Sequence, residues 1–173
     1  YKISDWLCDY VDGQHEFGYH SSAYTDDRLG DSLDALYESD RHSIMSLLSK
    51  KAIEVHNLET GVFHNDTTSI SLSGLYEVSS EAQGSVVATQ GHNKDGKPNC
   101  KQLVFGLTTT SDGHVPLYAK WYDGNMSDNA THQTTWQELS KFLAKTDYVY
   151  VADSKLATTE NMACIAQNGG HFI

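Results

Sequence analysis

The sequence predicts an α/β fold, in which a mixed sheet (an antiparallel meander plus a parallel strand) is flanked by helices and preceded by a small helical segment. Apolar runs at 103–110 and 115–122 are joined by Ser-Asp-Gly-His, and Asp-Gly between two such runs is typical of a β-hairpin. A helical pattern then precedes a third apolar run at 148–152. A helical crossover allows this last strand to lie parallel to the first strand and beside it.

The first 60 residues read as an irregular and helical segment. Residues 1–25 are rich in Tyr, His, Gly and Ser and show no clear periodicity. Asp26 and Asp27 offer a helix N-cap, and a second helix fits residues 41–56. The apolar residues that recur at helical spacing in these two helices, and that we expect to form packing or interaction surfaces, are Leu29, Leu33, Leu36, Tyr37, Ile44, Leu47, Leu48, Ala52 and Val55.

The character of the chain changes at Gly61, and we expect residues 61–173 to form one partial catalytic domain. Its first strand spans about 62–72, where Val, Phe, Thr and Ile are frequent. The further elements expected along this domain are a short strand at 86–88, a polar and locally basic loop at 91–98, the hairpin, a helix from 131 to about 145, the strand at 148–152, a final helix capped by Thr158 or Thr159, and the start of another strand at 171–173.

Composition limits the classes of function. The chain has 173 residues and a formal net charge of −11, which argues against a phosphate-binding surface spread over the whole domain. Any affinity for nucleic acid must therefore come from a local patch. No apolar run approaches the roughly 20 residues of a membrane helix, and three widely spaced cysteines without a CxxC pair suggest free thiols in a reducing cytosol.

Two aspartates, Asp66 and Asp153, each stand at the end of an apolar, β-branched run. A carboxylate at the end of a buried strand is costly unless a cation neutralises it. Taken singly, Asp66 also fits a strand-end turn and Asp153 an Asx-turn before the last helix. Taken together, on the first and last strong strands of one sheet, they indicate a shared site for a divalent metal ion with oxygen ligands.

Five stretches in this order resemble the catalytic region of DDE transposases from bacterial insertion sequences. They are HNDTTS (64–69), GHNKDGKPNCKQLVFGL (91–107), VPL (115–117), DGNMSD (123–128) and VADSKL (151–156). The resemblance implies a ribonuclease-H-like fold whose first two acids fall on Asp66 and Asp153. The third acid of this family is a Glu on a later helix, which we expect beyond Ile173, because Glu160 follows the second acid too closely. The chain thus reads as a fragment that is inactive on its own.

The same resemblance implies metal-dependent DNA cleavage and strand transfer. Two Mg²⁺ (or Mn²⁺) ions at Asp66 and Asp153 would act on the scissile phosphate. The implied partners are the transposon ends and the target DNA, with a homodimer as the complete assembly, no membrane, and a bacterial cytoplasmic location associated with the nucleoid. A nuclease that only hydrolyses, and an inactive remnant that only binds DNA or protein, remain as alternatives.

Other residues carry smaller expectations. The lysines that could touch DNA phosphates are Lys94, Lys97, Lys101 and Lys155, although a solvated loop also explains the first three and a surface position the last. His64 shares a strand face with Asp66 and could support the site. The residues expected to serve turns or packing are Asp123, Asp128, Trp121 and Trp136.

Overall fold

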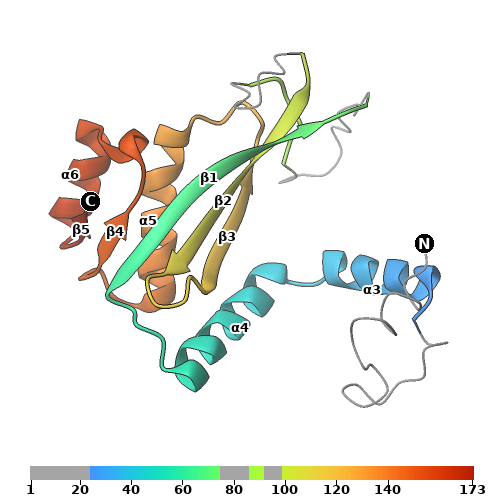
Figure 1. Ribbon diagram of the computed structural model, residues 1–173, viewed down its shortest axis with the longest axis horizontal. Helices are drawn as coiled ribbons and strands as arrows, with labels where there is room; N and C mark the ends of the chain where they lie inside the picture. Colours follow the sequence, from blue (N-terminus) through green and yellow to red (C-terminus); the bar gives the residue numbers. More distant parts are fainter. Residues whose placement is uncertain (1–23, 75–85, 92–98) are drawn as a thin grey trace. The chain divides into compact units, whose positions relative to one another are not determined.

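The computed structural model describes residues 24–74, 86–91 and 99–173 (Figure 1). The chain divides into two compact units, Tyr1–Ile44 and Met45–Ile173, which are described separately. The first unit contains α3 (Asp26–Glu38), whose N-cap is Thr25. The Thr25 side chain accepts a hydrogen bond from the Arg28 amide at 3.3 Å. The prediction of Asp26 or Asp27 as the cap was wrong, because both carboxylates lie in the first turn, where they favour the helix dipole.

The predicted packing stripes of the first two helices are exposed. On α3, Leu29, Leu33, Leu36 and Tyr37 are all between 44% and 61% exposed. The helix α4 (Arg41–His56) has the predicted bounds, but Leu47, Leu48 and Val55 are at least 60% exposed.

Residues 45–56 of α4 belong to the second unit, and the side of the helix that packs within this unit is the one with Ser49 and Ile53. Ser49 is buried, and its hydroxyl donates to the Leu117 carbonyl oxygen at 2.8 Å. Ile53 packs against the core. A small polar residue with a long-range hydrogen bond therefore marks the packed side of α4. The stripe predicted as a packing or interaction surface is exposed at Leu47, Leu48 and Val55, so these residues do not pack in the core.

The second unit is built on a five-stranded sheet in the order β3-β2-β1-β4-β5. Its strands are β1 (Val62–Leu72), β2 (Lys101–Thr110), β3 (Pro116–Tyr122), β4 (Val149–Val151) and β5 (His171–Phe172). The first three strands form an antiparallel meander, while β4 pairs with β1 in parallel and β5 with β4 in parallel. The predicted meander, hairpin and parallel strand are confirmed, and the arrangement is that of a ribonuclease-H-like fold.

Two elements differ from the prediction. Residues 86–88 form no strand, and their neighbour Thr89 makes only an isolated bridge with Gln102. This segment is held by Asp123, whose Oδ1 accepts a hydrogen bond from the Val87 amide at 2.8 Å. The turn role predicted for Asp123 thus includes anchoring this segment. The helix expected at 131–145 is α5 (Asp128–Leu143), which begins three residues earlier.

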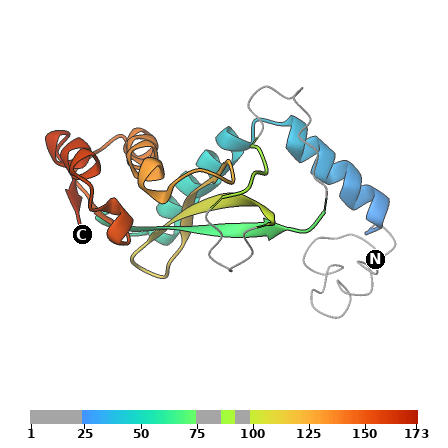
Figure 2. The same ribbon diagram turned by 90° about the horizontal axis from the view of Figure 1, so that it is seen from above.

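The helices α5 and α6 (Thr159–Gln167) lie on the same side of the sheet (Figure 2). Thr158 caps α6 as predicted, because its side chain accepts a hydrogen bond from the Asn161 amide. The short 3₁₀ helix η2 (Ser154–Leu156) connects β4 to α6. The buried core lies between helices and sheet and contains Phe63, Leu117, Trp136, Leu139, Tyr148, Tyr150, Leu156 and Ile165. The core position predicted for Trp136 is confirmed.

The two faces of the sheet are distinct along β1. Phe63, Asn65 and Thr67 are buried, whereas His64, Asp66 and Thr68 between them are exposed. We call the side that packs against α5 and α6 the covered face, and the side that bears His64, Asp66 and Thr68 the open face. Trp121 is not a core residue, because it is 44% exposed and contacts only Phe105 among the described aromatic rings, at 4.6 Å between centroids.

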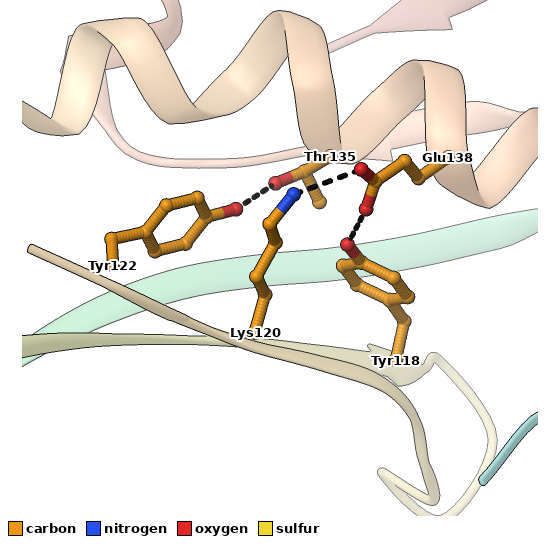
Figure 3. Close-up of polar contacts among 5 residues, drawn as sticks. All are labelled: Tyr118, Lys120, Tyr122, Thr135 and Glu138. Carbon is orange, nitrogen blue, oxygen red and sulfur yellow. Dashed lines mark hydrogen bonds and ion pairs between the residues drawn. The ribbon is translucent and has the colours of Figure 1, made fainter. Parts of the chain in front are cut away.

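The edge strand β3 is attached to α5 by polar contacts on the covered face (Figure 3). Glu138 of α5 accepts a hydrogen bond from the Tyr118 hydroxyl and forms a 2.8 Å ion pair with Lys120. The hydroxyls of Tyr122 and Thr135 share a hydrogen bond of 2.9 Å. Burial lowers the pKa of Lys120 and raises that of Tyr122. These contacts fix the crossover helix against the meander, and the helix in turn leads into β4.

Candidate functional site

The register between β1 and β4 bears on the two predicted metal ligands, Asp66 and Asp153. Val62 pairs with Val149, Phe63 with Tyr150 and His64 with Val151, all in parallel. Continuing this register by two residues would set Asp153 beside Asp66. Neighbouring strands lie about 4.8 Å apart, so two carboxylates at matching positions can reach one metal ion. The parallel pairing exists because α5 returns the chain to the end of the sheet at which β1 begins.

Both aspartates are exposed, and each carboxylate has a local hydrogen bond. Oδ1 of Asp66 accepts from the Thr67 amide at 2.7 Å. Oδ1 of Asp153 accepts from the Lys155 amide at 3.0 Å, and Asp153 is the N-cap of η2. The predicted reason for a metal, a carboxylate buried at a strand end, was therefore wrong for both residues. Asp153 has the Asx-turn role that the sequence predicted, and this role uses only one oxygen of its carboxylate.

A pocket of about 300 Å³ lies on the open face and reaches from β2 across β1 to the end of β4. Its lining contains Asp66 and His64 together with Asn65, Leu107, Thr109, Val151 and Ala152. Asp153 follows the lining residue Ala152 directly in the chain but is not itself a lining residue. The open face thus offers a concave surface with one carboxylate, that of Asp66, in its wall.

Buried polar residues beneath the pocket hold β1 in place. Asn65 lies between His64 and Asp66 but points to the covered face, where its Nδ2 donates to the Leu107 carbonyl at 3.2 Å and the Thr108 hydroxyl at 2.9 Å. On β4, the Tyr150 hydroxyl lies 3.3 Å from Nδ1 of the buried His132. Burial raises the pKa of Tyr150 far above its usual value, so its hydroxyl remains protonated. Polar contacts of buried side chains therefore help to hold β1, which carries Asp66, and β4, which precedes Asp153.

The donor set suits a hard divalent cation, because carboxylate oxygens are the ligands that Mg²⁺ and Mn²⁺ prefer. Asp66 lies within β1, and Asp153 follows the end of β4 by two residues. Among the described residues, no group of three or more His, Cys, Asp or Glu side chains is arranged to hold a metal ion. The chain therefore supplies at most a two-carboxylate site in the part described.

The four predicted DNA-contacting lysines occupy different places. Lys155 is exposed in η2, two residues after Asp153, and lies at the site. Lys101 begins β2 opposite Leu72, six residues along the strand from the partner of Asp66, which is about 20 Å at the rise of a strand. Lys101 is thus not part of the same site. Lys94 and Lys97 fall outside the residues that the structure describes.

Sequence reasoning missed Asn65 and Thr109. Asn65 is a buried polar residue in an otherwise alternating strand, and this unusual placement was a signal for a structural hydrogen bond. Thr109 faces His64 across the β1–β2 pair and lines the pocket, a position that only the register reveals. His64 lies on the open face as expected, and its role in the site stays a prediction.

No family model matches the chain, and no curated protein matches it. Among solved structures, the chain is similar to a pre-cleavage Mos1 transpososome, with 9% identity and a TM-score of 0.42 over 98% of this chain and 57% of that chain. It is also similar to a Mos1 transposase paired-end complex with the left transposon end (10% identity, TM-score 0.42, 98% and 56% covered). A third such structure is a Mos1 mariner paired-end complex with Mn (11% identity, TM-score 0.41, 98% and 56% covered).

This chain spans a little over half the length of those chains. At this level of likeness, the fold assignment rests on the strand order and directions of the sheet. The matched structures are mariner complexes and give no support to the bacterial insertion-sequence type that the motifs resemble. Among the described helices, none is long and apolar enough to cross a membrane.

Proposed function

We propose that this chain carries two metal-binding acids of a DDE transposase, Asp66 and Asp153, and acts in metal-dependent DNA cleavage and strand transfer. The observation that supports the proposal most is the parallel register of β1 and β4, which, continued by two residues, would set Asp153 beside Asp66. Composition alone gives no such expectation, since an acidic chain repels DNA phosphates. The bacterial insertion-sequence origin suggested by the five motifs is part of this proposal.

The proposed roles follow from where each side chain stands. Divalent ions, when bound, would neutralise the scissile phosphate and lower the pKa of an attacking water or DNA 3′-hydroxyl. Asp66, in the pocket wall, would be a ligand of both Mg²⁺ or Mn²⁺ ions. Asp153 would be a ligand of one of them. Lys155 is exposed beside Asp153 and would contact a phosphate of the same strand. Asn65 keeps β1 and β2 together beneath Asp66, and so positions that carboxylate.

The proposed partners are transposon ends and target DNA, with a homodimer as the assembly and a location with the DNA of a bacterial cell. Because the formal net charge is −11, DNA contact at this site requires bound cations together with local lysines. Binding should then depend on the divalent ion and should fall with rising salt, with a shallow slope that reflects few phosphate contacts.

The test uses DNA ends taken from the sequences that flank the gene, a supercoiled target plasmid, and Mg²⁺ or Mn²⁺. We expect strand cleavage and joining by the full-length protein, which would supply the third acid, and a loss of at least about 100-fold in Asp66→Asn and in Asp153→Asn. Asp147→Asn is the matched control, because Asp147 is an exposed carboxylate just before β4.

Each product in this assay has a defined meaning. Joined products establish a transferase, whereas nicks without joining indicate the hydrolytic nuclease. DNA binding without either product indicates the inactive binding module. Cleavage that persists unchanged in Asp66→Asn contradicts the proposed site, whichever product forms.

A further inference from the structure

Two histidines approach each other on the open face, next to the pocket. His64 projects from β1, and His114 lies in the hairpin between β2 and β3. Their ring centroids are 6.1 Å apart, with an angle of 70° between the ring planes. Both side chains are exposed, so water and ions have access to them. The two residues are 50 positions apart in the sequence, and the hairpin brings them together.

The hairpin that carries His114 is held in a defined conformation. The Asp112 carboxylate accepts a hydrogen bond from the Glu59 amide at 2.8 Å, which lowers the pKa of Asp112. The Thr110 hydroxyl donates to the Asp112 carbonyl at 3.1 Å and accepts from the Val115 amide at 3.2 Å. His114 itself has a φ of 53°, directly after Gly113 at 81°. The imidazole of His114 is therefore presented by a structured turn.

We propose that His64 and His114 together bind one divalent transition-metal ion of the imidazole-preferring class, namely Zn²⁺, Ni²⁺ or Cu²⁺. A metal–nitrogen bond of about 2.0–2.1 Å sets two imidazoles on one ion with their centroids about 5–6 Å apart. The observed separation of 6.1 Å is close to this range, and both side chains are exposed. Water completes the coordination.

This site differs in chemistry from the proposed carboxylate site. Imidazole selects Zn²⁺, Cu²⁺ and Ni²⁺, whereas carboxylate and water suit Mg²⁺ and Mn²⁺. Asp66 stands two residues after His64 on the same face, about 6.6 Å along the strand. No third His, Cys, Asp or Glu completes the pair among the described residues, so the site consists of two imidazoles. The inference stands whether or not the chain acts on DNA.

The test is a calorimetric titration of the purified protein with Ni²⁺ in a weakly chelating buffer. We expect one site per chain that is tighter than the background of the other histidines. His64→Gln and His114→Gln should each weaken this site at least about tenfold, and the double variant should reduce Ni²⁺ binding to the background of the other histidines, with losses that do not simply add because one bound ion couples the two residues. His171→Gln, an exposed histidine at β5, is the matched control. Circular dichroism melts check that each variant is folded.

Cu²⁺ electron paramagnetic resonance adds a structural readout, with two nitrogen ligands expected in the wild type and one in either variant. Unchanged Ni²⁺ affinity in His64→Gln and His114→Gln overturns the inference. An equal loss in His171→Gln overturns it as well. Asp66→Asn separates the two sites: it should leave Ni²⁺ binding intact, and a tenfold loss there would contradict a site made of two imidazoles.

Discussion

Along β1, neighbouring side chains meet two different surroundings. Phe63 is fully buried on the covered face, where its ring meets Tyr148 edge-on at 5.2 Å between centroids. His64, the next residue, is exposed on the open face and lines the pocket with Asp66. The covered face holds the fold together, and the open face carries the candidate chemistry. Stability and metal binding should therefore respond to substitutions on opposite faces of the same strand.

The largest expected effect is on stability and comes from the covered face. Phe63→Ala removes a fully buried aromatic ring and should lower the free energy of unfolding by about 3–5 kcal/mol, as core truncations of this kind do. His64→Ala, one residue along, should change it by less than about 0.5 kcal/mol, as expected for an exposed side chain. Urea unfolding followed by circular dichroism measures both. Similar losses in the two variants would contradict the assignment of the faces.

The next effect is a pH dependence that also belongs to the covered face. Burial raises the pKa of Tyr148 to about 12 from the ordinary value of 10.0, and its hydroxyl donates to the Trp136 carbonyl at 3.1 Å. Because the pKa of Tyr148 is raised in the folded state, the contribution of its protonated hydroxyl to folding stability is complete below pH 10. This contribution is lost as the pH rises through about 12.

Stability should therefore fall between pH 10 and 12, by up to about 3 kcal/mol from this one group. Tyr148→Phe should be less stable than the wild type at pH 8, because a buried hydrogen bond is lost, but it should show a smaller further loss at high pH. Thermal melts between pH 8 and 11.5 compare the two proteins. An identical alkaline loss in both would show that Tyr148 is not responsible.

Small stability effects are also expected on the open face at the aspartates themselves. Asp66→Asn and Asp153→Asn keep the shape of each side chain, and the amide oxygen can still accept the local backbone hydrogen bonds. We expect changes in the free energy of unfolding of less than about 1 kcal/mol for each, measured by urea unfolding. A larger loss would assign these carboxylates a structural role.

The sheet was the part of the fold that sequence patterns predicted best. Three local patterns predicted the strands: the alternation of side chains along 62–72, the Asp-Gly turn, and the apolar run before Asp153. The tertiary contacts of these segments favour the same structures as the local patterns. Packing that depends on single long-range contacts left a weaker signal. Ser49 marks the packed side of α4 through one hydrogen bond to Leu117, and the more apolar side of that helix is exposed.

For the candidate site, the sequence placed Asp66 and Asp153 on neighbouring strands but explained them by the wrong physical reason. Both carboxylates are exposed, so burial cost gives no indication of a metal ion. What would set them side by side is the register of two parallel strands, continued two residues past the end of β4, and that register depends on the length of the crossover and the twist of the sheet. Asn65 and Thr109 were missed for the same reason, because their positions become informative only once β1 is paired with β2 and β4.

The most direct test of the account is a Mn²⁺ titration of the purified protein, followed by the loss of free-ion electron paramagnetic resonance signal. Asp66→Asn and Asp153→Asn should each weaken binding at least about tenfold, with Asp147→Asn unchanged. The double variant should be little weaker than the worse single variant, because ligands that share an ion are coupled. An affinity that is unchanged in both single variants, or losses that simply add, would contradict a shared metal site at the junction of β1 and β4.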